Sequence, residues 1–124
     1  MLAALAGTRY APDYQGALLL TEDIGEESYR IDRMLAQLEL NGSLNAASAL
    51  MFGQFTQDLS RTTNTPHRPV EEVLNEYAVR NGKPAITNLM YGHTAKKLTL
   101  PFGIQCSIDM KRQTFSLDEA ALIA

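Results

Sequence analysis

The stretch Leu18-Leu19-Leu20-Thr21-Glu22-Asp23-Ile24-Gly25-Glu26 joins a continuous apolar run to a group of carboxylates. An apolar run that is bounded by turn residues, here from Gly16 to Thr21, is typical of a strand buried on both faces. Open α/β sheets carry their functional groups where such strands end. The sequence therefore predicts a buried strand at this place and makes Glu22 a candidate functional residue.

Two amphipathic helices are predicted further along the chain. The first covers residues 28–40, and the second begins near Pro69, a residue that suits the first helical position. In both segments apolar residues recur at i, i+3, i+4 and i+7, which places them on one face of a helix. These residues are Ile31, Met34, Leu35 and Leu38 in the first helix and Val70, Val73, Leu74 and Tyr77 in the second.

Further strands are predicted between and after the helices. A second buried strand is expected within residues 46–55, ending near Gly53, and a third over residues 85–89, while residues 56–67 read as one long polar loop. Residues 103–117 alternate around a turn, which predicts a hairpin at the end of the sheet. This order of elements predicts the α/β class: a single compact domain over residues 1–124, with a mixed β-sheet and flanking helices.

The composition excludes several classes of function. With 124 residues and a net charge of −3, the chain has no electrostatic footprint for nucleic acid or for an anionic membrane. It has no apolar run long enough to span a bilayer and no basic start typical of a secretory signal. Its single cysteine, Cys106, cannot form an internal disulfide and fits a reducing compartment. We therefore expect a cytoplasmic protein.

A second candidate functional residue is His93, which follows Gly92 just beyond the third predicted strand. A carboxylate that orients an imidazole forms two thirds of a catalytic triad, so Glu22 and His93 together suggest acid–base chemistry. The missing third is a nucleophile on a sharp glycine-flanked turn. The serines of this chain include no Gly-x-Ser-x-Gly elbow to provide it.

From the residues alone, other interpretations of these side chains stay open. Glu22 is equally compatible with a solvated carboxylate or a helix cap, and His93 with a structural or surface residue. The neighbouring Asp23, Glu26 and Glu27 raise the possibility of a divalent metal, although no calcium-loop pattern is present. His67 is expected at the surface, and the spacing of the two histidines and the cysteine does not suit zinc.

Several motifs resemble the C-terminal domain of the LD-carboxypeptidases, which are cytoplasmic serine peptidases that include the microcin C immunity enzymes. The resemblance covers essentially the whole chain. It rests on the opening Leu5-Ala6-Gly7-Thr8, on Leu18 to Glu26, on Tyr29 to Leu35 with Gln37-Leu38, on Gly92-His93, and on Thr99 to Gly103. Thr21 departs from the apolar residue that is common in the family, with little expected consequence.

The resemblance implies a swivelling β/β/α-like C-terminal domain that contributes the glutamate and the histidine of a Ser-Glu-His triad. Glu22 matches the triad glutamate and His93 the triad histidine. The nucleophilic serine of the family belongs to an N-terminal α/β domain, which we expect to be absent from these 124 residues. On this reading the isolated domain is inactive. No metal or organic cofactor is implied.

For the intact enzyme the resemblance implies removal of the terminal D-alanine from murein tetrapeptide, in the recycling of peptidoglycan. The partners implied are the murein peptide, the N-terminal domain and a second copy of the chain in a homodimer. Two alternatives remain. One is a microcin C immunity-type peptidase with the same triad, and the other is a non-catalytic binding or dimerisation module that keeps the fold.

Overall fold

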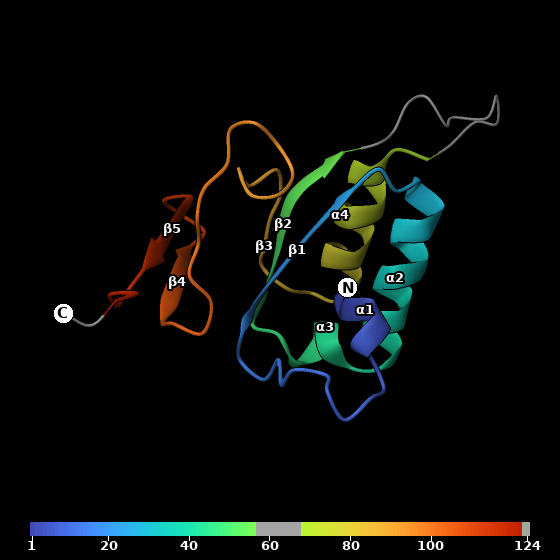
Figure 1. Cartoon of the computed structure of the whole chain (residues 1–124), viewed down its shortest axis with the longest axis horizontal. Coiled ribbons are helices and arrows are strands. Elements are labelled where there is room, and N and C mark those ends of the chain that lie inside the picture. The colour runs from blue at the N-terminus through green and yellow to red at the C-terminus, as the bar shows by residue number, and fades with distance from the viewer. Residues whose placement is uncertain (57–67, 123–124) are drawn as a thin grey trace.

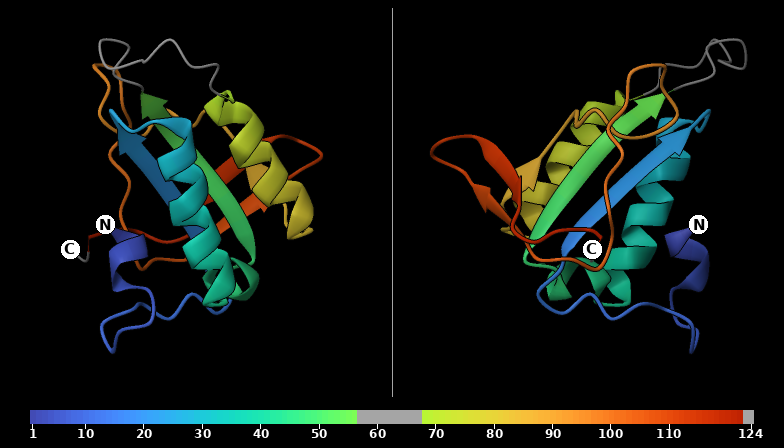
Figure 2. Two further views of the ribbon diagram at one scale, coloured as in Figure 1. Left: turned by 90° about the vertical axis from the view of Figure 1, so that its right-hand side faces the viewer. Right: turned by 60° about the vertical axis from the view of Figure 1, so that its left-hand side comes forward.

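The structure, a computed structural model, describes residues 1–56 and 68–122. Its centre is a parallel sheet of three strands in the order β1-β2-β3, formed by Leu18–Ile24, Ala49–Thr56 and Ala85–Ile86. Two long helices, α2 (Ser28–Leu40) and α4 (Val70–Arg80), cover one face of this sheet, and the C-terminal segment lies on the other side (Figures 1 and 2). The predicted α/β class is confirmed.

The core lies between the sheet and the two long helices. Leu19, Leu50 and Phe52 project from the sheet onto the apolar faces of α2 and α4, and all are at most 4% exposed. The helical residues that the periodicity singled out pack against them: Ile31, Leu35, Leu38, Val70, Val73, Leu74 and Tyr77 are buried, and Met34 is partly buried. The 3.6-residue period therefore identified both helices correctly.

Two short helices complete this layer. α1 (Leu2–Leu5) contacts α2, and α3 (Ser43–Ala46) leads into β2. The second strand was expected within residues 46–55 with its end near Gly53; β2 begins at Ala49, after α3, and runs on to Thr56. Gly42 has a φ of 85°, which ends α2 and starts the turn into α3. Among the described residues, no helix has the length and apolarity needed to cross a bilayer.

The predicted hairpin forms, but it does not join the main sheet. β4 (Cys106–Asp109) and β5 (Thr114–Leu117) pair antiparallel as a separate two-stranded sheet, so the single mixed sheet that the sequence suggested is replaced by two sheets. The third predicted strand is also shorter than expected, because β3 ends at Ile86 rather than at residue 89. Asn88 has a φ of 59°, and a residue in the left-handed region cannot continue a strand.

Each face of the main sheet is therefore covered by a different part of the chain. Opposite the helices, Ala49 and Met51 face the C-terminal segment across a cleft of about 610 Å³, which Phe102, Ile108 and Phe115 help to line. A long loop was predicted over residues 56–67; Thr56 is instead the last residue of β2, and residues 57–67 lie outside the described part of the chain.

Candidate functional site

Glu22 lies within β1, near its carboxyl end, whereas the apolar run in the sequence ended one residue earlier, at Thr21. Strand pairing is regular up to Thr21, which pairs with Phe52, and resumes where Asp23 pairs with Phe55. Glu22 therefore stands opposite two residues of β2, Gly53 and Gln54. One extra residue on one strand is a β-bulge, a feature that redirects side chains and is common beside functional sites.

His93 reaches Glu22 from a segment 71 residues further along the chain. Its Nδ1 lies 2.9 Å from Oε2 of Glu22. Glu22 and His93 can meet because the strands are parallel and their carboxyl ends lie at one edge of the sheet. His93 follows β3, the last of these strands in the chain. The Glu22 side chain is 22% exposed and that of His93 is 58% exposed, so the carboxylate is sheltered while the imidazole stays open to approach.

Two glycines allow this close approach. A β-carbon on Gly92 would lie 2.9 Å from Oε2 of Glu22, and the φ of 128° at this residue is itself one that other residues rarely adopt. A β-carbon on Gly53 would lie 3.1 Å from the β-carbon of Glu22 and 2.5 Å from the carbonyl oxygen of Tyr91. Any larger residue at either position would displace the carboxylate or the backbone before His93.

The hydrogen bond also determines what the imidazole can do. A carboxylate only accepts hydrogen bonds, so Nδ1 of His93 must carry the proton that is shared with Glu22. In the neutral ring Nε2 then holds a free lone pair. A histidine in this state can accept a proton from a nucleophile at Nε2, while the carboxylate stabilises the imidazolium that forms.

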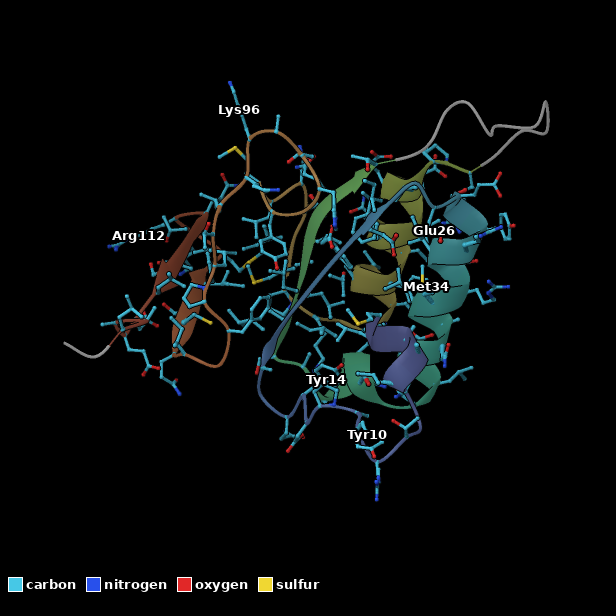
Figure 3. All side chains as sticks on the ribbon, viewed as in Figure 1. Tyr10, Tyr14, Glu26, Met34, Lys96 and Arg112 are labelled. Atoms are coloured by element: carbon cyan, nitrogen blue, oxygen red, sulfur yellow. The ribbon has the colours of Figure 1, made fainter. Side chains whose placement is uncertain are left out.

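The other carboxylates of this region have different surroundings. Asp23 accepts a hydrogen bond from the backbone N–H of Ile24, and burial raises the pKa of its carboxyl group, with smaller contributions that include repulsion from Glu26 and Glu22. Glu26 forms an ion pair with Arg30 in the first turn of α2, and Figure 3 shows Glu26 beside the start of that helix. In the described part of the chain, no group of three or more potential ligands is arranged to hold a metal.

The remaining candidates from the sequence are not part of this pair. Cys106 is half-buried on β4, where burial and then the charge of Asp118 raise the pKa of its thiol. A raised pKa keeps a thiol protonated and unreactive, in agreement with a packing role. His67 lies outside the described residues.

A cleft of about 340 Å³ adjoins Glu22 and is mostly apolar. Tyr91 and Phe102 line it with their rings edge to face, 6.2 Å apart between centroids. Met34 lines it from α2 and points toward the sheet in Figure 3. Sequence patterns assigned no role at the site to Tyr91, Phe102, Gly53 or Gln54, because their roles depend on contacts between distant segments. The Gly-Gln pair within an otherwise apolar strand was the one available signal.

Comparisons with known proteins agree with this architecture. The sequence model described as the LD-carboxypeptidase C-terminal domain matches residues 1–108. A protein of Streptomyces coelicolor named as a carboxypeptidase is 36% identical over 123 residues, which are 98% of this chain and 38% of that protein.

Two solved structures are similar throughout the chain. The muramoyltetrapeptide carboxypeptidase of Oxalobacter formigenes is 36% identical with a TM-score of 0.73, and the match covers 98% of this chain and 39% of that one. The microcin C7 self-immunity protein is 25% identical with a TM-score of 0.80, over 98% of this chain and 36% of that one. The chain thus spans well under half the length of the relatives it matches, and it belongs to the LD-carboxypeptidase family through their C-terminal domain.

Proposed function

We propose that this chain supplies the glutamate and the histidine of a Ser-Glu-His triad in a serine carboxypeptidase. The observation that carries the proposal is the hydrogen bond of 2.9 Å between Nδ1 of His93 and Oε2 of Glu22. The substrate we propose is murein tetrapeptide, from which the enzyme would remove the terminal D-alanine. Support comes from membership of the family and from the similar Oxalobacter structure, which is named as a muramoyltetrapeptide carboxypeptidase.

The nucleophilic serine would come from an N-terminal α/β domain of a longer protein. The relatives are long enough to include such a domain, since this chain matches only 38% of the Streptomyces protein. The open imidazole supports the same idea, because a ring that is 58% exposed is accessible to a hydroxyl arriving from another domain. By itself the chain of 124 residues, which has no Gly-x-Ser-x-Gly elbow, would orient the histidine without supplying the family's nucleophile.

In the assembled site each residue would have one task. His93 would accept the serine proton at Nε2 as the hydroxyl oxygen attacks the carbonyl carbon of the scissile bond. It would then return the proton to the leaving amine. Glu22 would hold the imidazole in the required tautomer and stabilise its positive charge. A second cycle with water as the nucleophile would release the acyl group from the serine.

We further propose a cytoplasmic enzyme of peptidoglycan recycling that acts as a homodimer without a metal or an organic cofactor. Exposed apolar side chains support self-association, among them Phe102 at 70% and Met110 at 52% exposure. A mass in solution that stays monomeric at tens of micromolar protein would contradict the dimer.

A second substrate class is supported by one observation. The microcin C7 self-immunity protein matches 98% of this chain, as the Oxalobacter structure does, with TM-scores of 0.80 and 0.73, so similarity of fold does not separate the two substrate classes. A peptidase of that type would use the same Glu22 and His93. Assays of one longer enzyme on murein tetrapeptide and on an aminoacyl sulfamoyl nucleoside would separate the two classes.

The role of His93 is tested by replacing it with alanine in a longer protein that contains this domain. General acid–base catalysis contributes roughly 10²–10⁴-fold, so we expect His93→Ala to lower kcat by at least about 100-fold with a smaller change in KM. His67→Ala, at the only other histidine of the chain, is the matched control and should retain activity. A loss of only a few-fold in His93→Ala would refute the proposed function.

A further inference from the structure

The segment that carries His93 has little regular structure of its own. Between the end of β3 at Ile86 and the start of β4 at Cys106, the described chain contains no helix or strand. Backbone hydrogen bonds nevertheless attach part of it to β2. The N–H of Leu89 donates to the carbonyl oxygen of Phe52 at 3.0 Å, and the N–H of Gln54 donates to that of Tyr91 at 2.7 Å.

Between Ile86 and Leu89 the chain leaves β2 and returns, with Asn88 in the left-handed region at a φ of 59°. The side chain of Gln54 bridges this excursion. Its Nε2 lies 2.8 Å from Oδ1 of Asn88, 3.2 Å from the carbonyl oxygen of Asn88 and 3.1 Å from that of Leu89. Three oxygens surround one amide nitrogen that has two hydrogens. A side chain at position 54 must therefore donate hydrogen bonds here, and one that only accepts them does not fit.

We propose that Gln54 is a positioning residue, which holds the turn at residues 88–91 against β2 and thereby keeps His93 in contact with Glu22. The catalytic meaning of this role rests on the proposed function, whereas the positioning itself does not. Gln54 lies in the bulge opposite Glu22, so one short stretch of β2 shapes both halves of the pair.

The tolerance for movement in this region is small. The carbonyl oxygen of Tyr91 lies against Gly53, and Gly92 lies against both the Glu22 carboxylate and the carbonyl oxygen of Gln54. A shift of the turn by a few tenths of an ångström therefore changes how the backbone before His93 meets Glu22. Since the imidazole itself is largely exposed, its orientation depends on this turn and on its hydrogen bond to Glu22.

The test uses a substitution that keeps the size of the side chain and reverses its hydrogen-bonding character. Gln54→Glu would place a carboxylate against three oxygens, which repels the turn. Gln54→Met keeps the length but removes the donor without adding charge. Gln15→Glu, an exposed position before the start of β1, adds the same charge far along the sheet from Glu22 and serves as the control.

The measurement is the tautomer of His93, read from long-range ¹H–¹⁵N correlations of the imidazole at a pH where the ring is neutral. A His67→Gln background leaves His93 as the single histidine. In that background we expect the proton on Nδ1. Gln54→Glu and Gln54→Met should lose this preference and give mixed tautomers, while Gln15→Glu and the conservative Asn88→Asp, which keeps the acceptor, should retain it.

Each outcome decides the proposal. A folded Gln54→Glu or Gln54→Met variant with the tautomer of the parent overturns it, and circular dichroism establishes which variants are folded. If Gln54→Glu does not fold, Gln54→Met alone carries the test. The tautomer does not depend on turnover, so an active His93→Ala enzyme would refute the proposed function and leave the positioning by Gln54 standing.

Discussion

The carbonyl oxygen of Tyr91 lies 2.5 Å from the point where a β-carbon on Gly53 would stand. The segment before His93 thus passes directly over a residue that has no side chain. Gly53 belongs to β2 and is buried, so the requirement for glycine there is one of space. The contact links the bulge in β2 to the backbone that carries the imidazole.

We expect Gly53→Ala to destabilise the domain by about 1–3 kcal/mol, the usual range for overpacking a filled site. The added methyl group must displace Tyr91 or Glu22, so the His93 imidazole signal should shift as well. Urea denaturation gives the stability, and NMR gives the signal.

Gly82→Ala is the control: its β-carbon would meet nothing within 4 Å, although its φ of 60° adds strain. That variant should lose stability with no change at His93. If the His93 signal responded in the same way in both variants, the packing argument would be contradicted.

The resemblance gives Thr21 as a departure from the family with little expected consequence, whereas the structure indicates that this residue has a cost. Within the described residues, its buried hydroxyl oxygen has no hydrogen-bond partner. Thr21→Val keeps the shape and removes the unsatisfied group, so it should raise the free energy of unfolding by about 1 kcal/mol. Thr114→Val, at an exposed position on β5, should stay within about 0.5 kcal/mol of the parent. A destabilised Thr21→Val variant would mean that the hydroxyl does have a partner.

Tyr77 makes the stability depend on pH in alkaline solution. Burial, followed by the hydrogen bond to Asp32, raises the pKa of the Tyr77 hydroxyl from 10.0 to about 12. The folded state therefore holds this proton more tightly than the unfolded state. The resulting stability is fully present below pH 10 and is lost as the pH rises toward 12, up to about 2–3 kcal/mol.

The variant Tyr77→Phe removes both this titration and the hydrogen bond of 2.9 Å to Oδ1 of Asp32. We expect it to be about 0.5–1.5 kcal/mol less stable than the parent at neutral pH and to lose less stability between pH 9 and pH 11. Urea denaturation at several pH values measures both effects. Tyr29→Phe, with a side chain that is 51% exposed, is the control and should follow the parent. Parallel pH profiles for Tyr77→Phe and the parent would contradict the raised pKa.

Much of the fold could be predicted from local patterns. The spacing of apolar residues located α2 and α4, because a helix that packs on a sheet must repeat its buried positions every three or four residues. The apolar run from Leu18 located β1 for a similar reason, since a strand covered on both faces has little polar surface. The ends of these elements were less certain: β1 extends to Ile24 and β3 stops at Ile86.

The pairing of Glu22 and His93 was a prediction from the sequence, whereas the geometry of the contact was not. In the sequence each residue follows an apolar run, and the family resemblance supplied their roles. Their hydrogen bond spans 71 positions of the chain and depends on the order of the strands and on the bulge opposite Glu22. No local period encodes either feature.

The sequence by itself determined the class of the fold and the two long helices, because burial patterns repeat within each element and can be read without knowing its neighbours. The two candidate residues came from their positions after apolar runs and from the family resemblance. The tertiary structure alone decided that the hairpin forms its own sheet, that Gly53 and Gly92 make room for the carboxylate, and that Gln54 holds the turn before His93. Each of these depends on atoms of distant segments meeting at distances of about 3 Å, which only the packing of the whole chain sets.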